Sequence, residues 1–209
     1  MTAAVSVFSD GGPRVVSAPT AALPQHSAAC VEHYTPVEIV EAARLTMQNI
    51  DLDPASTASV NVQRVKADTF FSTVDDGLSQ PWRGRVWLNP PGGRNPPGGR
   101  FGKHKSSAAA WWAKLAEEYA SGRVTQAVFL GFSIEIMATA QDACIWAGEM
   151  PFCIPRCRIA FLQEKDGAFV PGTSPTHANV IVYLPPREER ASAIERFIGT
   201  FERFGRVRA

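Results

Sequence analysis

Hydrophobic residues along the chain occur either in short runs, typical of buried strands, or at the three- and four-residue spacing of amphipathic helices. The short runs lie at 50–53, 85–88, 127–130, 152–154, 157–162 and 178–184. The helical spacing covers 36–47, 106–120, 134–147 and 187–204, and a turn or helix is expected from Ala55 towards Val65. Short apolar strands that alternate with helices predict an α/β fold with a mostly parallel sheet.

Two of these helices carry sequence signals for where they begin. Thr35 is interpreted as an N-cap, with Pro36 at the first helical position and Glu38 three residues after the cap. A serine at 106 or 107 is expected to cap the second of them, and Gly122 to end it.

The length of the chain, 209 residues, is that of one domain carrying a tail. Residues 1–30 are rich in Ala, Ser, Pro and Thr and show no sustained periodicity, which predicts a flexible leader. Residues 31–209 are expected to form a single domain, with no separate target-recognition domain.

Composition excludes some classes of protein. The 21 basic and 20 acidic side chains give a formal net charge of +1, which excludes a histone-like polycation but not a local basic patch. The first residues lack the basic segment of an export signal, and no apolar run reaches the ~20 residues of a membrane span. With four cysteines and no export signal, we expect a cytoplasmic protein with reduced thiols and no membrane partner.

A six-residue duplication follows the strand expected at 85–88. Residues 89–94 and 95–100 both read Asn-Pro-Pro-Gly-Gly-Arg. Because proline fixes φ and removes a backbone donor, the Pro90 carbonyl and the Asn89 amide oxygen make two rigid acceptors. Two such acceptors hold both hydrogens of an exocyclic NH2 group and leave the nitrogen lone pair exposed. Taken alone, the peptide is explained equally well as a connector without chemistry, and the second copy is interpreted as a loop extension.

Positive charge gathers directly after Asn89. Four fixed cations lie within twelve residues, with an aromatic ring among them: Arg94, Arg100, Phe101, Lys103 and Lys105. Contact with nucleic-acid phosphates is the functional interpretation, and a solvated basic loop is the alternative.

An acidic turn follows the strand expected at 50–53. Asp53-Pro54-Ala55-Ser56 places a carboxylate and backbone amides at a strand end, where ligands of parallel sheets bind. No Gly-rich phosphate loop occurs in the chain. Alone, this turn is also compatible with a purely structural role.

Taken together and in this order, Thr-Pro at 35–36, Asp-Pro-Ala at 53–55 and Asn-Pro-Pro at 89–91 resemble the amino-methyltransferases that use S-adenosylmethionine. More narrowly, the chain resembles the phage-type DNA N6-adenine methyltransferase (Dam) family, through HYTPVEIVEAAR at 33–44, IDLDPAS at 50–56, DDGLSQPW at 75–82 and GRVWLNPP at 84–91. The similarity is close over 33–91, looser to about residue 184, and does not cover the leader or the last helix.

The resemblance implies a Rossmann-like methyltransferase sheet, mostly parallel with an antiparallel strand near the C-terminal end. It implies transfer of a methyl group from S-adenosylmethionine to the exocyclic amine of a DNA base, most directly an adenine flipped out of a duplex. The family's catalytic tetrapeptide corresponds to Asn89, Pro90, Pro91 and Gly92. Its cofactor positions correspond to Tyr34, Thr35, Pro36, Asp53, Pro54, Ala55 and Ser56, with Asp51, Asn61 and Asp68 as further candidates. If the chain is encoded by a phage or prophage, its compartment is the cytoplasm of a bacterial host.

Gly92 departs from the family, which usually carries at this position an aromatic residue that stacks on the extruded base. Phe101, Trp111 and Trp112 are possible substitutes, although both tryptophans also fit helix packing. Two alternatives therefore stay open. The acceptor is another amine or amide (cytosine, a modified base, RNA or protein), or the chain is a nucleic-acid-binding protein with a decayed active site.

Overall fold

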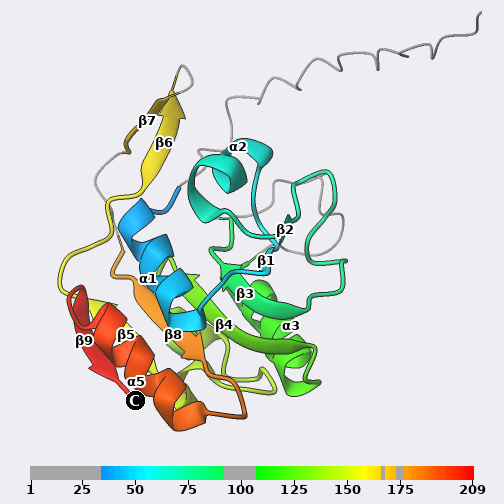
Figure 1. Ribbon diagram of the computed structural model, residues 1–209, viewed down its shortest axis with the longest axis vertical. Coiled ribbons are helices and arrows are strands. Elements are labelled where there is room, and N and C mark those ends of the chain that lie inside the picture. Colours follow the sequence, from blue (N-terminus) through cyan, green and yellow to red (C-terminus); the bar gives the residue numbers. More distant parts are fainter. Residues whose placement is uncertain (1–33, 92–106, 166–167, 173–176) are drawn as a thin grey trace, which may run out of the picture.

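A seven-stranded sheet forms the centre of the molecule, with helices on both of its faces (Figure 1). The computed structural model describes residues 34–91, 107–165, 168–172 and 177–209. The leader expected over 1–30 lies outside these residues, as does the stretch from Gly92 to Ser106, so the predictions for both stay predictions.

The sheet has the strand order β2-β1-β3-β4-β8-β5-β9. Strands β1 (Leu52–Asp53), β2 (Thr69–Phe70), β3 (Gly84–Leu88) and β4 (Val124–Gly131) pair in parallel. Strands β8 (Val180–Leu184), β5 (Phe152–Pro155) and β9 (Gly205–Arg208) add to β4 by antiparallel pairing. The mixed α/β class with a mostly parallel sheet is confirmed, and it is compatible with a Rossmann-like fold. Within the described sheet, both β8 and β9 run against the other strands, where the resemblance implied one such strand.

In the part of the chain that the structure describes, three helices of eleven or more residues cover the sheet. Helices α1 (Val37–Met47) and α5 (Arg190–Phe201) pack side by side on one face, and α3 (Ala108–Ala120) packs on the other (Figure 1). The strand residues alternate between these layers: Trp87 packs with α1 and α5, whereas Val86 and Leu88 pack with α3. The two hydrophobic layers explain why the buried strands read as continuous apolar runs.

The ends of the helices agree with the sequence signals at α3 and differ at α1. The Ser107 hydroxyl accepts a hydrogen bond from the Ala110 amide at 3.2 Å, and Gly122 takes a left-handed φ of +78° just after the helix. At α1 the cap position is Pro36, and no side chain caps the helix. The interpretation of Thr35 as an N-cap is therefore wrong, because the chain stays extended through Pro36 (φ −53°, ψ 139°) and the helix begins one residue later than expected.

Two further segments differ from the sequence expectations. The helix expected at 134–147 is reduced to α4 (Ile136–Thr139) and the 3-10 turn η2 (Ala147–Glu149), where the Trp146 indole donates to the Met137 carbonyl and folds the chain back. The run expected as a strand at 157–162 forms none over 157–161, and its last residue, Leu162, begins β6 (Leu162–Lys165). The Ile159 amide donates instead to the side chain of Asn179 at 2.8 Å.

Shorter elements surround the sheet. Helix α2 (Ala58–Val60) continues into a π-helical turn η1 (Asn61–Val65) after β1, as the pattern from Ala55 to Val65 indicated. Strands β6 (Leu162–Lys165) and β7 (Ala168–Pro171) form a separate two-stranded hairpin, paired to the main chain of Tyr34 through Leu162. Across the described ranges, no helix combines the length and hydropathy that membrane crossing requires.

Candidate active site

The two peptides singled out in the sequence lie at the ends of neighbouring strands. Strand β1 pairs in parallel with β3, with Leu52 opposite Val86, and both strands end within three residues of that pair. The chain leaves β1 for β2 on one side and returns to β3 on the other side. Such a reversal is a topological switch point, beyond whose strand ends ligands of open α/β sheets bind. The structure thus brings the Asp53 turn and Asn89 to one edge of the sheet.

Asp53 is the buried acid of this edge, with only 3% of its surface exposed. Its Oδ1 accepts a hydrogen bond from the Ala55 amide at 3.1 Å. Burial raises the pKa of the Asp53 carboxyl to about 7, and the Ala55 amide and the neighbouring Ser56 hydroxyl offset part of that increase. A carboxyl held this way changes charge readily when a cation or hydrogen-bond donor binds next to it.

Two buried hydroxyls among the predicted cofactor residues have no hydrogen-bond partner in the part of the chain that the structure describes. They are Thr35 Oγ1 and Ser56 Oγ, in side chains that are 5% and 8% exposed. The Ser56 hydroxyl lies close enough to Asp53 to affect its pKa, but its geometry does not make a hydrogen bond. Buried polar atoms are nearly always satisfied in folded proteins, so orphaned hydroxyls fit a polar ligand.

The backbone of the acidic turn is fixed by β2 and the residue after it. The Phe71 amide donates to the Asp53 carbonyl, and the Ser56 amide donates to the Phe71 carbonyl, each at 2.9 Å. Pro54 is buried and Ala55 half-buried within this turn. These two hydrogen bonds hold both ends of the acidic turn against Phe71.

The loop from Ser72 to Arg83 supports the turn from behind, a role that sequence reasoning missed. A Cβ at Gly77 would lie 2.0 Å from the Pro54 carbonyl oxygen, so only glycine permits this approach. The Trp82 indole donates to the Gly77 carbonyl at 2.7 Å and stacks on Trp111 with ring centroids 5.8 Å apart. The glycine and tryptophan within DDGLSQPW are the signal that could have indicated this support.

The catalytic candidates begin where β3 ends. Asn89 is half-buried, Pro90 is buried and Pro91 is exposed. Gly92 and the proposed nucleic-acid contacts Arg94, Arg100, Phe101, Lys103 and Lys105 all lie outside the described residues. Trp111 and Trp112 are 2% and 0% exposed, so neither ring is available to stack on an extruded base in this conformation.

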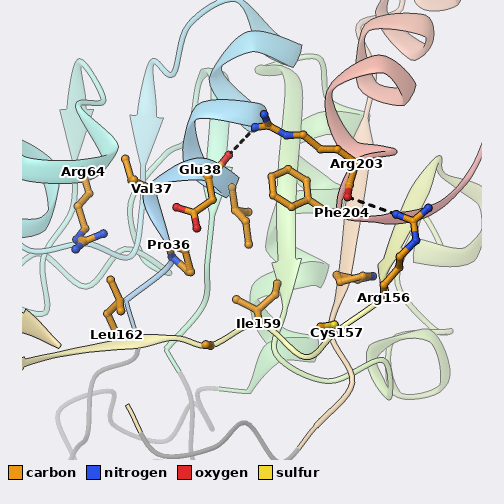
Figure 2. A pocket seen from close by; sticks show the side chains of 13 residues that line it. Pro36, Val37, Glu38, Arg64, Arg156, Cys157, Ile159, Leu162, Arg203 and Phe204 are labelled. Atoms are coloured by element: carbon orange, nitrogen blue, oxygen red, sulfur yellow. Dashed lines mark hydrogen bonds between the residues drawn. The ribbon is translucent and has the colours of Figure 1, made fainter. Parts of the chain in front are cut away.

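Tyr34 and Pro36 flank Thr35 but contact other parts of the molecule. The Tyr34 ring packs edge-on against Phe169 of β7, with centroids 5.1 Å apart. Pro36 lines a pocket together with the start of α1, Arg64, the segment between β5 and β6 and the residues after α5 (Figure 2). Among these three residues before α1, Thr35 contributes the buried hydroxyl without a hydrogen-bond partner.

The three weaker cofactor candidates are occupied by structural interactions. Asp51, before β1, forms an ion pair with Arg85, whose Nη2 lies 2.6 Å from Oδ1, and these contacts lower the pKa of Asp51 despite partial burial that raises it. Asp68 is exposed and accepts from Asn49. The buried Asn61 side chain exchanges two hydrogen bonds with the main chain of Ala67. The geometry does not bring these three to the strand ends where Asp53 and Asn89 lie.

Comparison with known proteins adds no family assignment. No family model matches the chain, and no curated protein matches it significantly. Fold and site together define a class, a mixed α/β protein with a buried acid and an Asn-Pro-Pro peptide at a switch point of its sheet.

Proposed function

We propose that this chain is an S-adenosylmethionine-dependent methyltransferase acting on the exocyclic amine of a DNA base, with adenine as the first candidate. One observation carries the proposal: the Asp53–Ser56 turn and the Asn-Pro-Pro peptide, 36 positions apart at Asp53 and Asn89, meet at neighbouring strand ends. This is the edge at which a cofactor and its acceptor must be held together.

The residues present fit the cofactor. The Thr35 and Ser56 hydroxyls are buried orphan atoms able to bind polar groups, and an ionised Asp53 would favour a hydroxyl, ammonium or sulfonium ligand. When bound, S-adenosylmethionine would supply an electrophilic methyl group on a sulfonium. Its transfer would form a nitrogen–carbon bond as the sulfur–carbon bond breaks and would release one amine proton to solvent.

The chain contributes alignment more than acid–base chemistry. The Asn89 amide oxygen and the Pro90 carbonyl would accept the two amine hydrogens and leave the lone pair directed at the methyl carbon. Proline at 90 fixes φ, and burial of its ring restricts the peptide further, so these acceptors reorganise little during the reaction.

A second candidate keeps the cofactor and changes the acceptor. It is favoured by the absence of a ring at Gly92 together with the burial of Trp111 and Trp112. Base stacking contributes roughly 1–3 kcal/mol, so an enzyme without it would bind a flipped adenine less firmly. Another planar amine or amide is the acceptor in that case.

The test has two stages. Calorimetry with S-adenosylmethionine should give saturable binding that Asp53→Asn weakens, and absence of binding would leave only the non-enzymatic nucleic-acid-binding alternative. DNA treated with the protein and cofactor, then digested to nucleosides, should contain N6-methyl-2′-deoxyadenosine by mass spectrometry. N4-methyl-2′-deoxycytidine, or DNA that stays unmodified although the cofactor binds, would point to the second candidate.

Substitution of the catalytic candidate tests the mechanism. We expect Asn89→Ala to reduce transfer by about a hundredfold or more, the usual result of removing one preorganised hydrogen-bonding group, while cofactor binding is retained. Asn95→Ala, in the second copy of the repeat, is the matched control and should be mild. Full activity of Asn89→Ala would contradict the mechanism. A large loss of activity in Asn95→Ala would assign the catalytic role to the second copy of the repeat.

A further inference from the structure

A pocket of about 610 Å³ lies outside the candidate active site (Figure 2). Its walls come from the start of α1, from the segment between β5 and β6 and from the turn between α5 and β9, with Arg64 of η1 and Leu162 of β6 completing them. Of the predicted site residues it shares only Pro36, and neither Asp53 nor Asn89 lines it. This volume is within the range of small-molecule and cofactor sites.

Three guanidinium groups and one carboxylate give the pocket its charge. Figure 2 shows Arg64 and Arg156 at opposite ends of the pocket, with Glu38 between them and Arg203 along one side. Among the side chains that the structure describes, no carboxylate oxygen lies within 4.0 Å of these three arginines. The fixed charges lining the pocket therefore amount to three positive and one negative.

Two of these arginines are held in place by main-chain carbonyls. Arg156 Nη1 donates to the Glu202 and Arg203 carbonyls at 3.3 and 3.4 Å. Arg203 Nη2 donates to the Glu38 carbonyl at 3.3 Å. These bonds use few of the five donors on each guanidinium and do not neutralise its charge, so the remaining N–H groups can bind an anion.

Arg64 adds a buried donor that has no acceptor. Its guanidinium carbon lies 4.0 Å from the centroid of the Phe169 ring, and its Nε is buried without a hydrogen-bond partner in the described part of the chain. Burial lowers the pKa of Arg64, an effect that the charge of Glu38 opposes. A buried N–H without an acceptor is rare unless a ligand supplies one.

Apolar side chains complete the pocket. Ile39 and Ile159 are buried beneath it, and Phe204 is half-buried with its ring in contact with the Arg203 guanidinium, 4.6 Å from the centroid. The amino end of α1 also begins here, and its dipole favours negative charge.

We propose that this pocket binds a nucleoside phosphate. The phosphate lies against Arg156, ribose hydroxyls or a base amine donate to Glu38, and the apolar face of the base covers Phe204 and Ile159. Arg64 and Arg203 add positive charge along the pocket. Glu38 is the reason to expect more than a bare anion, since its carboxylate repels inorganic phosphate but accepts hydrogen bonds from a nucleoside. The site does not depend on the proposed methyl transfer.

Calorimetric titration with AMP, adenosine and inorganic phosphate tests the proposal. We expect saturable binding of AMP, with adenosine and inorganic phosphate each at least tenfold weaker. The double variant Arg156→Gln/Arg203→Gln should weaken AMP at least tenfold. Arg83→Gln/Arg190→Gln is the control, because it removes the same charge from two exposed arginines that do not line the pocket, and it should change the affinity less than twofold.

Further arms separate this site from the candidate active site and identify the source of the nucleotide. Asp53→Asn should leave AMP binding unchanged, and Glu38→Gln should weaken AMP but not inorganic phosphate. A tetranucleotide that binds tenfold tighter than AMP, with the same sensitivity to the arginines, identifies a nucleic-acid strand, whereas equal or weaker binding identifies a free nucleotide. Absence of saturable AMP binding, or AMP binding lost in Asp53→Asn and kept in the double arginine variant, overturns the proposal.

Discussion

At the scale of single residues, Asp53 combines near-complete burial with a titration close to neutral pH. Its carboxyl has few partners: within the described chain it accepts a hydrogen bond from the Ala55 amide, and the neighbouring Ser56 hydroxyl makes no hydrogen bond. Removing the carboxylate from water without a cation raises its pKa from 3.8 to about 7. The folded protein without ligand therefore bears a cost for ionising this residue.

That cost predicts a pH dependence of stability with a definite sign. Because the folded-state pKa is higher than the unfolded one, the contribution of Asp53 is most favourable below about pH 4 and is lost as pH rises to about 7. The full loss is of the order of 4 kcal/mol. Urea denaturation of wild type and Asp53→Asn at pH 4 and 8 should show wild type losing stability relative to the variant. A difference that does not change with pH would mean that the carboxylate ionises without penalty.

Gly77 is the second residue whose chemistry the fold dictates. Alanine at this position would put a Cβ 2.0 Å from the Pro54 carbonyl oxygen, so the acidic turn or its supporting loop must move. We expect Gly77→Ala to lower the free energy of unfolding by about 1–3 kcal/mol and to weaken S-adenosylmethionine binding at least tenfold in calorimetry. Gly199→Ala in α5 is the control, because no atom lies within 4 Å of its added Cβ, and it should be neutral or slightly stabilising.

At the scale of elements, the two ends of β1 have different roles. Asp51 at the amino end is bound by the Arg85 side chain and also accepts from the Arg85 amide at 2.8 Å. Gly84 next to it needs a left-handed φ of +72°, and a Cβ there would lie 2.5 Å from Asp51 Oδ2. At this end of β1 the contacts of Asp51 with Arg85 and Gly84 stabilise the strand pairing, whereas the other end of β1 lies at the candidate site.

Substitution of each acid separates these roles. Asp51→Asn should lower stability by about 1 kcal/mol, a modest value because the ion pair with Arg85 is partly exposed, and should leave cofactor affinity within twofold of wild type. At pH 7, Asp53→Asn should not lower stability but should weaken cofactor binding. Denaturation and calorimetry on both variants check the expectation, and a tenfold loss of cofactor affinity in Asp51→Asn would restore that residue to the cofactor site.

The elements also show which parts of the fold are readable from sequence. Helices α1, α3 and α5 follow the helical spacing of apolar residues because each buries one stripe against the sheet. Strands β2 and β9 have no comparable signal. A two-residue strand such as Thr69–Phe70 exists because β1 offers it hydrogen bonds, and β9 depends on pairing with β5. Hydrophobic periodicity indicates which residues are buried, whereas these two edge strands form because a neighbouring strand offers hydrogen bonds to them.

The same reasoning applies to the candidate site. The turn at Asp53 and the peptide at Asn89 could be placed at strand ends because each directly follows an apolar run. The sequence could not show that Asp51 and Asn61 are occupied by Arg85 and Ala67, since those partners are fixed only by strand and turn geometry. Nor could the sequence show the close approach of Gly77 to the Pro54 carbonyl, which is a contact between two main-chain segments.

At the scale of the whole molecule, the two proposed ligand sites lie in different halves of the sheet. The candidate active site belongs to β1 and β3, and the arginine-lined pocket belongs to the ends of β5, α1 and α5. Helix α1 adjoins both, since Thr35 precedes it and Pro36 and Glu38 line the pocket. The near-neutral charge of the chain therefore conceals a local excess of positive charge around that pocket.

Two glycines allow the independence of these sites to be tested. A Cβ at Gly205 would lie 1.9 Å from the Ile154 carbonyl oxygen, so Gly205→Ala should force β9 away from β5 and displace Phe204 and Arg203 from the pocket. We expect this variant to weaken AMP at least tenfold while S-adenosylmethionine affinity stays within twofold, and Gly77→Ala to give the opposite pattern. Both affinities are measured by calorimetry at a temperature where circular dichroism shows each variant folded. Parallel loss of both ligands in either variant would mean that α1 couples the two halves, because a displacement on one side of that helix would then reach the site on the other.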